Sequence, residues 1–377
     1  MGNSSYHNPV QTVFGFGSLE KLTALLGNRK AALVTTPGTL KRGVAKRIAE
    51  LAKQELKATE VCEPPSFEWL DENYDNFWQQ NGDAEVIIAI GGGSVIDAAK
   101  ALSVRATSGP RKGFAAIKDH LQGKSKLDNY EQKEIIAIAT TAGTGSEVTP
   151  WATLWHLAEK KKYSLHLPTL WPKVALIDPE LTITVPWQTT LIAGLDALSH
   201  ALEAIWNVNA NVVSTSLAIE AATTIMATLP QLKKELNNKQ ARIQMHRASL
   251  LAGLAFSNTK TALAHALSYP FTMKFKVLHG LACSFTLPAV LRHNRGHSHE
   301  CDEALSRIFS VDVDKADEKL ATFLHSLGVA TDYKSYGAKD AELEEIIKTV
   351  GGNPRFGNNI NPSVDGLFNA LAKENRA

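Results

Sequence analysis

Four side chains in the second half of the sequence have the types and the spacing of metal ligands. Asp196 and His200 are four residues apart, so on a helix they lie on one face and can bind the same cation. His265 and His279 follow downstream, each beside apolar residues. A carboxylate oxygen and three imidazole nitrogens suit Fe²⁺ or Zn²⁺ and leave room for a substrate oxygen. One histidine in an apolar helix is more often a core residue. Two such histidines together with the Asp196–His200 pair favour a metal site.

A second group of histidines, His293, His297 and His299, lies in a polar stretch rich in Arg, Asn and Gly. We interpret this stretch as a solvated loop rather than as a metal site.

Two stretches of small residues have the pattern of phosphate-binding turns. Gly91-Gly92-Gly93-Ser94 follows an apolar run and opens a predicted helix, whose N-terminal N–H groups attract a pyrophosphate. Ser94 and Asp97 also have the spacing of a capping box. Thr140–Glu147 follows another apolar run and offers hydroxyls and free amides. Two such turns at the ends of parallel strands converge on one crevice and predict a dinucleotide. For the glycine turn, a strand-to-helix connection without a ligand is the alternative.

The elements that must position these residues follow from the hydrophobic pattern. Continuous apolar runs at Lys30–Thr35, Glu85–Ile90 and Glu134–Ala139 predict strands covered on both faces, as in a parallel α/β sheet. A helical pattern separates the first two runs. From about Val185 onward, long Ala- and Leu-rich helical segments dominate. They are Leu191–Trp206, Ser214–Leu229, Gln240–Leu254, Ala262–Leu267 and Asp314–Leu327. We therefore expect an α/β nucleotide-binding domain at residues 1–182 and an all-α domain at residues 183–377.

The composition excludes several other classes of protein. The 377 residues are 44% hydrophobic and 21% charged, with a net charge of +2, so no strong field favours nucleic acid or a membrane surface. The three cysteines show no CxxC spacing, which is typical of a reducing compartment. We find neither a signal-like N-terminus nor an apolar run of membrane-spanning length, and we expect a cytoplasmic protein.

The order of these motifs resembles the iron-containing (group III) alcohol dehydrogenases, which share their architecture with dehydroquinate synthase. The resemblance is carried by Gly91–Ser94 with Asp97 and Lys100, by Thr140–Thr149, by Ile177–Thr182 and by Gly194–Ala204. It implies an N-terminal nucleotide-binding α/β domain and a helical domain that holds the metal. The residues that it implies for the metal are Asp196, His200, His265 and His279. The residues that it implies for the cofactor are Gly92, Gly93, Ser94, Thr140, Thr141, Thr144 and Lys162.

The sequence departs from the family pattern at three informative positions. Members that prefer NAD often carry Asp just after the first strand, where this chain has Thr36, so both NAD(H) and NADP(H) stay open. Tyr269 stands where a second histidine commonly assists proton transfer. Lys260 stands where the family usually keeps an uncharged residue.

These features lead to a chemical hypothesis. A metal ion would polarise an aldehyde oxygen while a nicotinamide supplies hydride, which reversibly yields a primary alcohol. Tyr269 is a candidate proton donor, with helix packing as the alternative. Because a partly enclosed lysine needs an anion, Lys260 indicates an aldehyde with a charged tail, such as sulfoacetaldehyde or phosphonoacetaldehyde, unless it points to solvent.

Three other functions remain open at this point. They are a dehydrogenase of neutral short-chain alcohols or diols, a metal-dependent lyase resembling dehydroquinate synthase, and a non-catalytic binding protein. For each dehydrogenase reading we expect a small-molecule substrate and a homo-oligomer, namely a dimer, although sequence does not give the oligomeric state.

Overall fold

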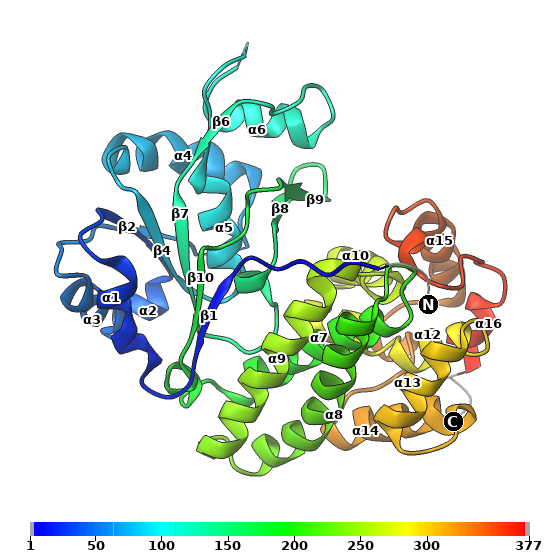
Figure 1. Cartoon of the computed structure of the whole chain (residues 1–377). Coiled ribbons are helices and arrows are strands. Elements are labelled where there is room, and N and C mark those ends of the chain that lie inside the picture. The colour runs from blue at the N-terminus through cyan, green and yellow to red at the C-terminus, as the bar shows by residue number, and fades with distance from the viewer. Residues whose placement is uncertain (1–3, 63, 110, 374–377) are drawn as a thin grey trace. The chain divides into compact units, whose positions relative to one another are not determined.

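A computed structural model describes residues 4–62, 64–109 and 111–373 (Figure 1). The chain forms two compact units, which are described separately. The α/β unit comprises Pro9–Thr141 and Ser146–Thr182. Within the described residues, the helical unit comprises residues 4–8, Ala142–Gly145 and 183–373. Neither unit is therefore one continuous stretch of sequence.

Six strands of the α/β unit form one sheet in the described part of the chain, in the order β1-β10-β7-β4-β2-β3. Every neighbouring pair is parallel, which confirms the predicted parallel α/β sheet. The strands are β1 (Gln11–Phe14), β2 (Ala31–Thr35), β3 (Ala58–Glu60), β4 (Val86–Gly91), β7 (Glu134–Ala139) and β10 (Val174–Ile177). The direction in which strands are added reverses between β2 and β4, which makes this pair the topological switch point of the sheet.

Helices cover both faces of this sheet (Figure 1). Ile87 and Ala89 of β4 pack with the helices on one face, and Val86, Ile88 and Ile90 pack with those on the other. Burial on both faces explains why the sequence of these strands is continuously apolar. The helices and short 3-10 turns of this unit are η1 (Ser18–Lys21), α1 (Leu22–Leu26), α2 (Pro37–Lys41), α3 (Val44–Ala52), α4 (Phe67–Asn81), α5 (Gly93–Ser103), α6 (Phe114–Leu121), η2 (Ser146–Val148) and η3 (Pro179–Thr182).

Two antiparallel ribbons complete the α/β unit, and the hydrophobic pattern does not predict either of them. One pairs β5 (Val104–Ala106) with β6 (Tyr130–Gln132), and the other pairs β8 (Trp151–His156) with β9 (Lys161–His166). In β9, polar residues outnumber apolar ones, and most of its side chains are not buried. Such a strand lacks the apolar run that reveals the strands of the main sheet.

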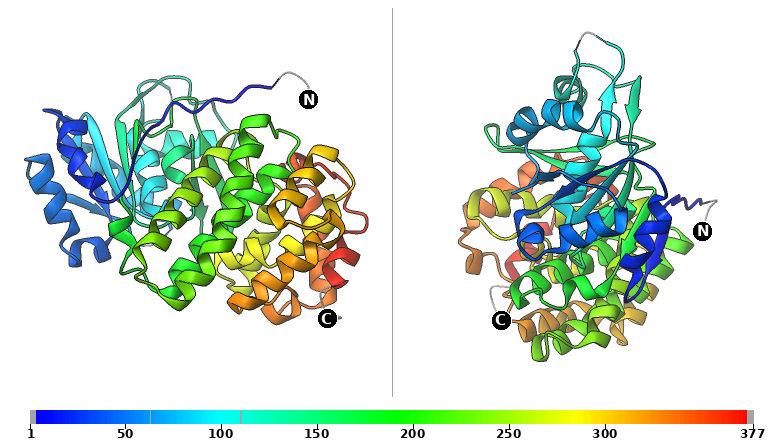
Figure 2. Two further views of the ribbon diagram at one scale, coloured as in Figure 1. Left: turned by 60° about the horizontal axis from the view of Figure 1, so that its bottom comes forward. Right: turned by 90° about the vertical axis from the view of Figure 1, so that its left-hand side faces the viewer.

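The helical unit contains the predicted long helices together with several shorter ones. α7, α8 and α9 lie side by side (Figures 1 and 2). Its elements are α7 (Trp187–Ile205), α8 (Val212–Lys234), α9 (Lys239–Thr259), α10 (Leu263–Phe275), α11 (His279–Ser284), α12 (Leu287–Asn294), α13 (His299–Phe309), η4 (Val313–Lys315), α14 (Ala316–Leu327), η5 (Lys334–Tyr336), α15 (Asp340–Gly351), η6 (Phe356–Asn358) and α16 (Leu367–Lys373).

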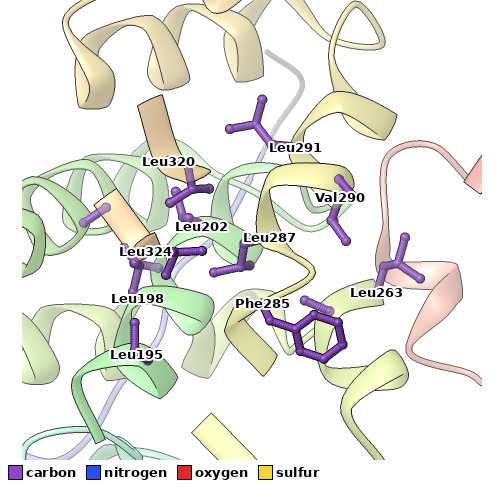
Figure 3. Packing of buried hydrophobic residues seen from close by; sticks show 14 of the residues in the cluster. Leu195, Leu198, Leu202, Leu263, Phe285, Leu287, Val290, Leu291, Leu320 and Leu324 are labelled. Atoms are coloured by element: carbon purple, nitrogen blue, oxygen red, sulfur yellow. The ribbon is translucent and has the colours of Figure 1, made fainter. Parts of the chain in front are cut away.

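The core of the helical unit is built from aliphatic side chains of helices distant in sequence. Figure 3 shows Leu198 and Leu202 of α7 close to Leu287 of α12 and to Leu320 and Leu324 of α14. All five side chains are fully buried. Burying a leucine stabilises a fold by about 1.5–3 kcal/mol, so this packing fixes α7, on which the candidate metal ligands begin.

One helix differs from the expectation that no apolar run reaches membrane-spanning length. α8 has 23 residues, and an 18-residue window within it has a mean hydropathy of 1.5, so by length and composition it is long and apolar enough to cross a membrane. In this unit, however, Ala218, Ala222, Ile225 and Leu229 of α8 are buried in the helical core. The same test is passed by the core helices of proteins that have no membrane span, so α8 is weak evidence for one.

Candidate active site

The carboxylate of Asp196 is the centre of the candidate metal site. Its Oδ1 lies 3.5 Å from His265 Nε2, 3.9 Å from His200 Nε2 and 4.0 Å from His279 Nε2. Ligand atoms that lie about 2.0–2.3 Å from a tetrahedral ion are about 3.3–3.7 Å apart. The structure thus brings together the four side chains expected at the metal, at separations close to those of a coordination sphere.

The helical turn of α7 and the close approach of α11 to α7 position these side chains. Asp196 and His200 lie one turn apart on α7, as their spacing predicts. His265 lies in the first turn of α10, and His279 is the first residue of α11. α11 approaches α7 so closely that a Cβ on Gly280 would lie 2.0 Å from the carbonyl oxygen of Ile192. Glycine at this position is what allows His279 to reach Asp196.

Glu203 on α7 holds the imidazole of His265, and sequence reasoning missed it. The backbone N–H of His265 donates to Glu203 Oε1 at 3.1 Å, and His265 Nδ1 donates to Glu203 Oε2. Glu203 is fully buried. A carboxylate that accepts the proton of Nδ1 leaves Nε2, which faces Asp196, as the nitrogen available to a metal, as in a metal-binding histidine. The spacing of Asp196, His200 and Glu203, at i, i+4 and i+7, was the available signal.

The protonation of Asp196 and His200 suits a cation. Burial favours the neutral form of Asp196, but the neighbouring His200, His265 and His279 outweigh it and hold the pKa of Asp196 below its usual range. Although burial opposes the shift, Cys283 and Glu203 raise the pKa of His265, so a metal at this imidazole would displace a proton. Burial lowers the pKa of His200 to about 4, although Asp196 opposes the shift. At neutral pH the site therefore has an ionised carboxylate and a neutral imidazole at His200.

Three buried polar atoms of the cluster, Asp196 Oδ1, His265 Nε2 and His200 Nδ1, lack a hydrogen-bond partner among the residues that the structure describes. Asp196 Oδ1 and His265 Nε2 face each other at 3.5 Å. Since leaving such atoms unsatisfied costs about 1–3 kcal/mol each, they fit a cation between them. Three of the four side chains are nearly buried, whereas that of His279 is 33% exposed, so the cluster opens to solvent beside His279.

A sulfur atom that sequence reasoning did not consider lies at the same cluster. Cys283 Sγ is 3.7 Å from His279 Nε2, one turn further along α11. The ligand atoms of Asp196, His265, His279 and Cys283 all lie within 4.8 Å of one another. The thiol is therefore within coordination reach and adds a soft donor to the set.

The two candidate substrate residues have different settings. The ring of Tyr269 is stacked on that of His279, with 6.1 Å between centroids and 5° between planes. Lys260 follows α9 as its C-cap with a positive φ of 66°, and its side chain is exposed. The carbonyl oxygen of Lys260 accepts from Asn207 Nδ2 at 3.1 Å, so its backbone is fixed while its ammonium faces solvent.

The expected phosphate-binding residues meet at one edge of the sheet in the α/β unit. Thr36, Gly92 and Thr140 directly follow the carboxyl ends of β2, β4 and β7, which are neighbouring parallel strands. The Thr140 N–H donates to the carbonyl oxygen of Gly91 at 2.9 Å, which ties the two turns together. The edge lies at the topological switch point, where doubly wound sheets bind nucleotides.

The glycine turn leaves its backbone accessible. A Cβ on Gly92 would lie 3.1 Å from Thr141 Oγ1, so a side chain there would crowd the second turn. Gly93 opens α5, and Ser94 is exposed. The expected capping box is wrong, because Gly92 is the N-cap residue and no side chain caps the helix.

The carboxylate of Asp97 accepts from Ser146 Oγ and, at 2.9 Å, from the Thr153 N–H. These bonds engage Asp97 with the segment after β7 rather than with its own helix. A spacing rule for capping could not reveal this partner, which is 49 residues away.

Thr36 at this edge also caps a helix, and the other two expected cofactor residues, Lys162 and Thr144, belong to other elements of the structure. Thr36 is the N-cap of α2, and its hydroxyl accepts from the Thr39 N–H at 3.1 Å. Lys162 lies on β9 of the antiparallel ribbon, with its ammonium 5.5 Å from the centroid of the Trp155 ring. Thr144 lies in the short segment Ala142–Gly145, which belongs to the helical unit.

A buried lysine, Lys100, reinforces the second turn. Its ammonium donates to the carbonyl oxygens of Ser146 at 2.7 Å and Trp151 at 2.8 Å. Burial lowers the pKa of Lys100 to about 8 and raises that of nearby Glu147 to about 7. Lys100 and Asp97, one turn apart on α5, therefore both hold the segment that follows β7.

The second group of histidines is not a solvated loop throughout. His293 is buried near the end of α12, and its carbonyl oxygen accepts from Asn361 Nδ2 at 2.8 Å. Burial lowers the pKa of His293. The apolar residues that surround α12 outweigh the polar composition on which the loop interpretation rested.

Comparisons with known proteins agree in both halves of the chain. Residues 9–179 match the family model described as iron-containing alcohol dehydrogenase, and residues 190–373 match that of the C-terminal domain of the Fe-containing alcohol dehydrogenase family. Long-chain-alcohol dehydrogenase 1 of Geobacillus thermodenitrificans is 32% identical over 359 residues, which cover 90% of this chain and 88% of that protein.

Two further relatives carry the names of reductases. Phosphonoacetaldehyde reductase of Streptomyces viridochromogenes is 36% identical over 211 residues, 56% of this chain and 53% of that protein. The crystal structure of sulfoacetaldehyde reductase from Bifidobacterium kashiwanohense in complex with NAD+ is similar with a TM-score of 0.89 and 28% identity. That match covers 99% of each chain.

Proposed function

Because the chain belongs to the iron-containing alcohol dehydrogenase family, we propose that it reduces a small aldehyde with an anionic tail to the primary alcohol. The family assigns it as an NAD(P)-dependent alcohol dehydrogenase that uses a divalent metal. The aldehyde itself, and the residues that act on it, are part of the proposal.

We assign the metal to Asp196, His200, His265 and His279. The unsatisfied Asp196 Oδ1 and His265 Nε2, both buried, support this assignment most directly. Either Fe²⁺ or Zn²⁺ suits these donors, and when bound it supplies Lewis-acid polarisation of a carbonyl group. Asp196 and the three imidazoles fix the position of that charge, and Glu203 keeps His265 in the required tautomer.

We assign the cofactor to the edge formed by the turns after β2, β4 and β7. Gly92, Gly93 and Ser94 would hold the pyrophosphate through backbone N–H groups at the start of α5. Thr140 and Thr141 follow on the adjacent strand, and Thr144 and Lys162 complete the proposed set. Thr36 stands at the position where an acidic residue would repel a 2′-phosphate, so we expect both NAD(H) and NADP(H) to bind.

Tyr269 is our candidate for proton delivery. Its ring lies against that of His279, the most exposed of the four proposed ligands. A phenol of ordinary pKa near 10 is a weak acid at neutral pH, so Tyr269 would need help to donate its proton readily.

The anionic tail is supported by two kinds of observation. Both reductase relatives are named for aldehydes with an acidic group, a phosphonate in one case and a sulfonate in the other. In this chain, Lys260 directly follows α9, but it is exposed, so the expected enclosed lysine is not found and only the positive charge of Lys260 supports an anionic tail. The neutral-substrate alternative is supported by the similarity to a long-chain-alcohol dehydrogenase. Family membership in both halves of the chain disfavours the lyase.

A substrate panel tests this proposal. The metal-loaded protein would be assayed with NADH and NADPH against phosphonoacetaldehyde, sulfoacetaldehyde and neutral aldehydes of similar length. We expect oxidation of the cofactor with a higher kcat/KM for the charged aldehydes. Preference for the neutral compounds would contradict the substrate class, and a lack of cofactor oxidation with every aldehyde would contradict the reaction. We further propose that the protein is cytoplasmic and forms a homodimer. Light scattering of the purified protein checks the dimer.

A further inference from the structure

Arg355, in a segment late in the sequence, contacts two residues of the metal-binding region, Thr261 and Tyr269. Its Nε donates to Thr261 Oγ1 at 3.2 Å, and its guanidinium lies over the ring of Tyr269. Asn358, three residues later, donates to the carbonyl oxygen of Thr261 at 2.8 Å. These contacts fix the segment of Arg355 against Thr261, which directly follows Lys260.

The guanidinium is close to the metal ligands through Tyr269. The Tyr269 ring is 6.1 Å from the ring of His279 and 5.1 Å from the guanidinium carbon of Arg355. Arg355 therefore lies no more than about 11 Å from the His279 ring, the sum of these two separations. The ring of Tyr269 thus links Arg355 to His279, the proposed ligand that is most exposed to solvent.

Arg355 and Lys260 are two cations that, among the residues that the structure describes, have no carboxylate within 4.0 Å of their side chains. Arg355 is half-buried, and Lys260 is exposed on the neighbouring segment. By contrast, Arg292 and Arg295 of the same unit are both paired with Asp317. A half-buried guanidinium with free N–H groups is a ready binding site for a sulfonate, phosphonate or carboxylate.

We propose that Arg355, assisted by Lys260, forms an anion-binding subsite that holds the charged end of the aldehyde. The inference rests on the proposed function, whose metal cluster defines where the carbonyl group must be. In a two-carbon aldehyde, the carbonyl oxygen and the tail atom are about 4 Å apart. The aldehyde and one charge-assisted hydrogen bond of about 2.8 Å together reach about 7 Å. This length is within the upper limit of about 11 Å between Arg355 and the His279 ring. Arg355 thus selects short aldehydes with an acidic group.

The charge of Arg355 is tested by paired variants and paired substrates. Arg355→Gln removes the charge, Arg355→Lys keeps it without the planar fork, and Arg307→Gln, at an exposed arginine on α13, is the matched control. With phosphonoacetaldehyde we expect kcat/KM to fall about 10- to 100-fold in Arg355→Gln and less in Arg355→Lys. With butanal, a neutral aldehyde of similar length, neither variant is expected to change kcat/KM.

Binding of the product separates recognition from turnover. Calorimetry with 2-hydroxyethylphosphonate should show weaker binding in Arg355→Gln than in the wild type, while Arg307→Gln should bind as the wild type does. Equal losses with phosphonoacetaldehyde and butanal would show that Arg355 supports Tyr269 structurally, and would overturn the subsite. So would an unchanged preference for phosphonoacetaldehyde in Arg355→Gln.

The same experiment distinguishes a failure of the Arg355 subsite from a failure of the proposed function. If wild-type protein prefers butanal, the anionic substrate class is wrong. If wild-type protein prefers phosphonoacetaldehyde and Arg355→Gln keeps that preference, the substrate class stands and the subsite is wrong. Thr261→Val removes the hydroxyl that orients Arg355, and we expect a smaller loss in the same direction, which provides a second test if Arg355→Gln does not fold.

Discussion

Replacement of Glu203 by Gln tests whether the proposed metal site depends on the tautomer of His265. The two carboxylate oxygens of Glu203 accept from the backbone N–H and from Nδ1 of His265. A glutamine has one oxygen to accept with, and its NH₂ group must face the other donor. If the amide oxygen keeps the backbone N–H, then NH₂ faces Nδ1, and the imidazole proton moves to Nε2. A protonated Nε2 has no lone pair for the metal.

The expected effect is a loss of metal affinity. Loss of an outer-shell partner typically lowers metal affinity 10- to 100-fold, which is about 1.4–2.7 kcal/mol. We expect the upper end of this range, because Glu203 is fully buried and water cannot replace its bonds. At saturating metal the stabilisation falls by the same amount, so the metal-induced rise in Tm becomes smaller by about 3–10 °C.

The assay is a chelator-competition titration of the metal-free protein with Zn²⁺, with Tm measured with and without the ion. Glu220→Gln on α8, where the side chain of Glu220 is 50% exposed and pairs with Arg247, is the matched control. Comparing each variant with and without metal cancels its effect on the metal-free fold. Unchanged Zn²⁺ affinity in Glu203→Gln would refute the role of Glu203 and weaken the assignment of His265 as a ligand.

Three other perturbations test separate parts of the structure. Thr36→Asp should lower kcat/KM for NADPH about 10-fold or more, with little change for NADH, since Asp can still cap α2 but repels a 2′-phosphate. Thr36→Asn is the uncharged control. An equal loss of kcat/KM with NADPH in the two variants would contradict the assignment of the ribose site. Burial raises the pKa of Glu147 from 4.5 to about 7, so the native state binds more protons and the stability of the α/β unit should fall by up to about 3 kcal/mol as pH rises from about 4.5 to 7. Urea unfolding should show a flatter pH profile for Glu147→Gln, and an unchanged slope would show that another group is responsible. Gly280→Ala should sharply lower metal content, because its Cβ would lie 2.0 Å from the Ile192 carbonyl oxygen; full metal content by elemental analysis would show that α11 can shift without loss of the site.

Features that depend on local periodicity were the most predictable from the sequence. The strands β2, β4 and β7 are apolar on both faces, and each matches an expected run to within one residue at either end. The spacing of Asp196 and His200 placed both on one face of α7. Both signals are local, because the pleat and the helical turn repeat over a few residues.

Features that depend on packing between distant segments were not predictable in the same way. The ribbon that carries Lys162 has mixed polarity, so its strands lack an apolar run. Arg355 approaches Thr261 across 94 residues of sequence, and a basic residue in a polar loop gives no sign of its partner. Glu203 is an intermediate case, since its spacing on α7 was visible but its bond to His265 spans 62 residues.

The short segment Ala142–Gly145 has a consequence for dissecting the protein. It follows a strand of the α/β unit, yet it packs within the helical unit, where a Cβ on Gly143 would lie 2.5 Å from the carbonyl oxygen of Ala193. A gene cut after codon 182 would therefore separate α7 from four residues that complete its packing. Expressed on its own, the C-terminal fragment would lack the residues that pack against α7 next to the turn that bears Asp196. Co-expression of the two halves would be needed to restore this packing.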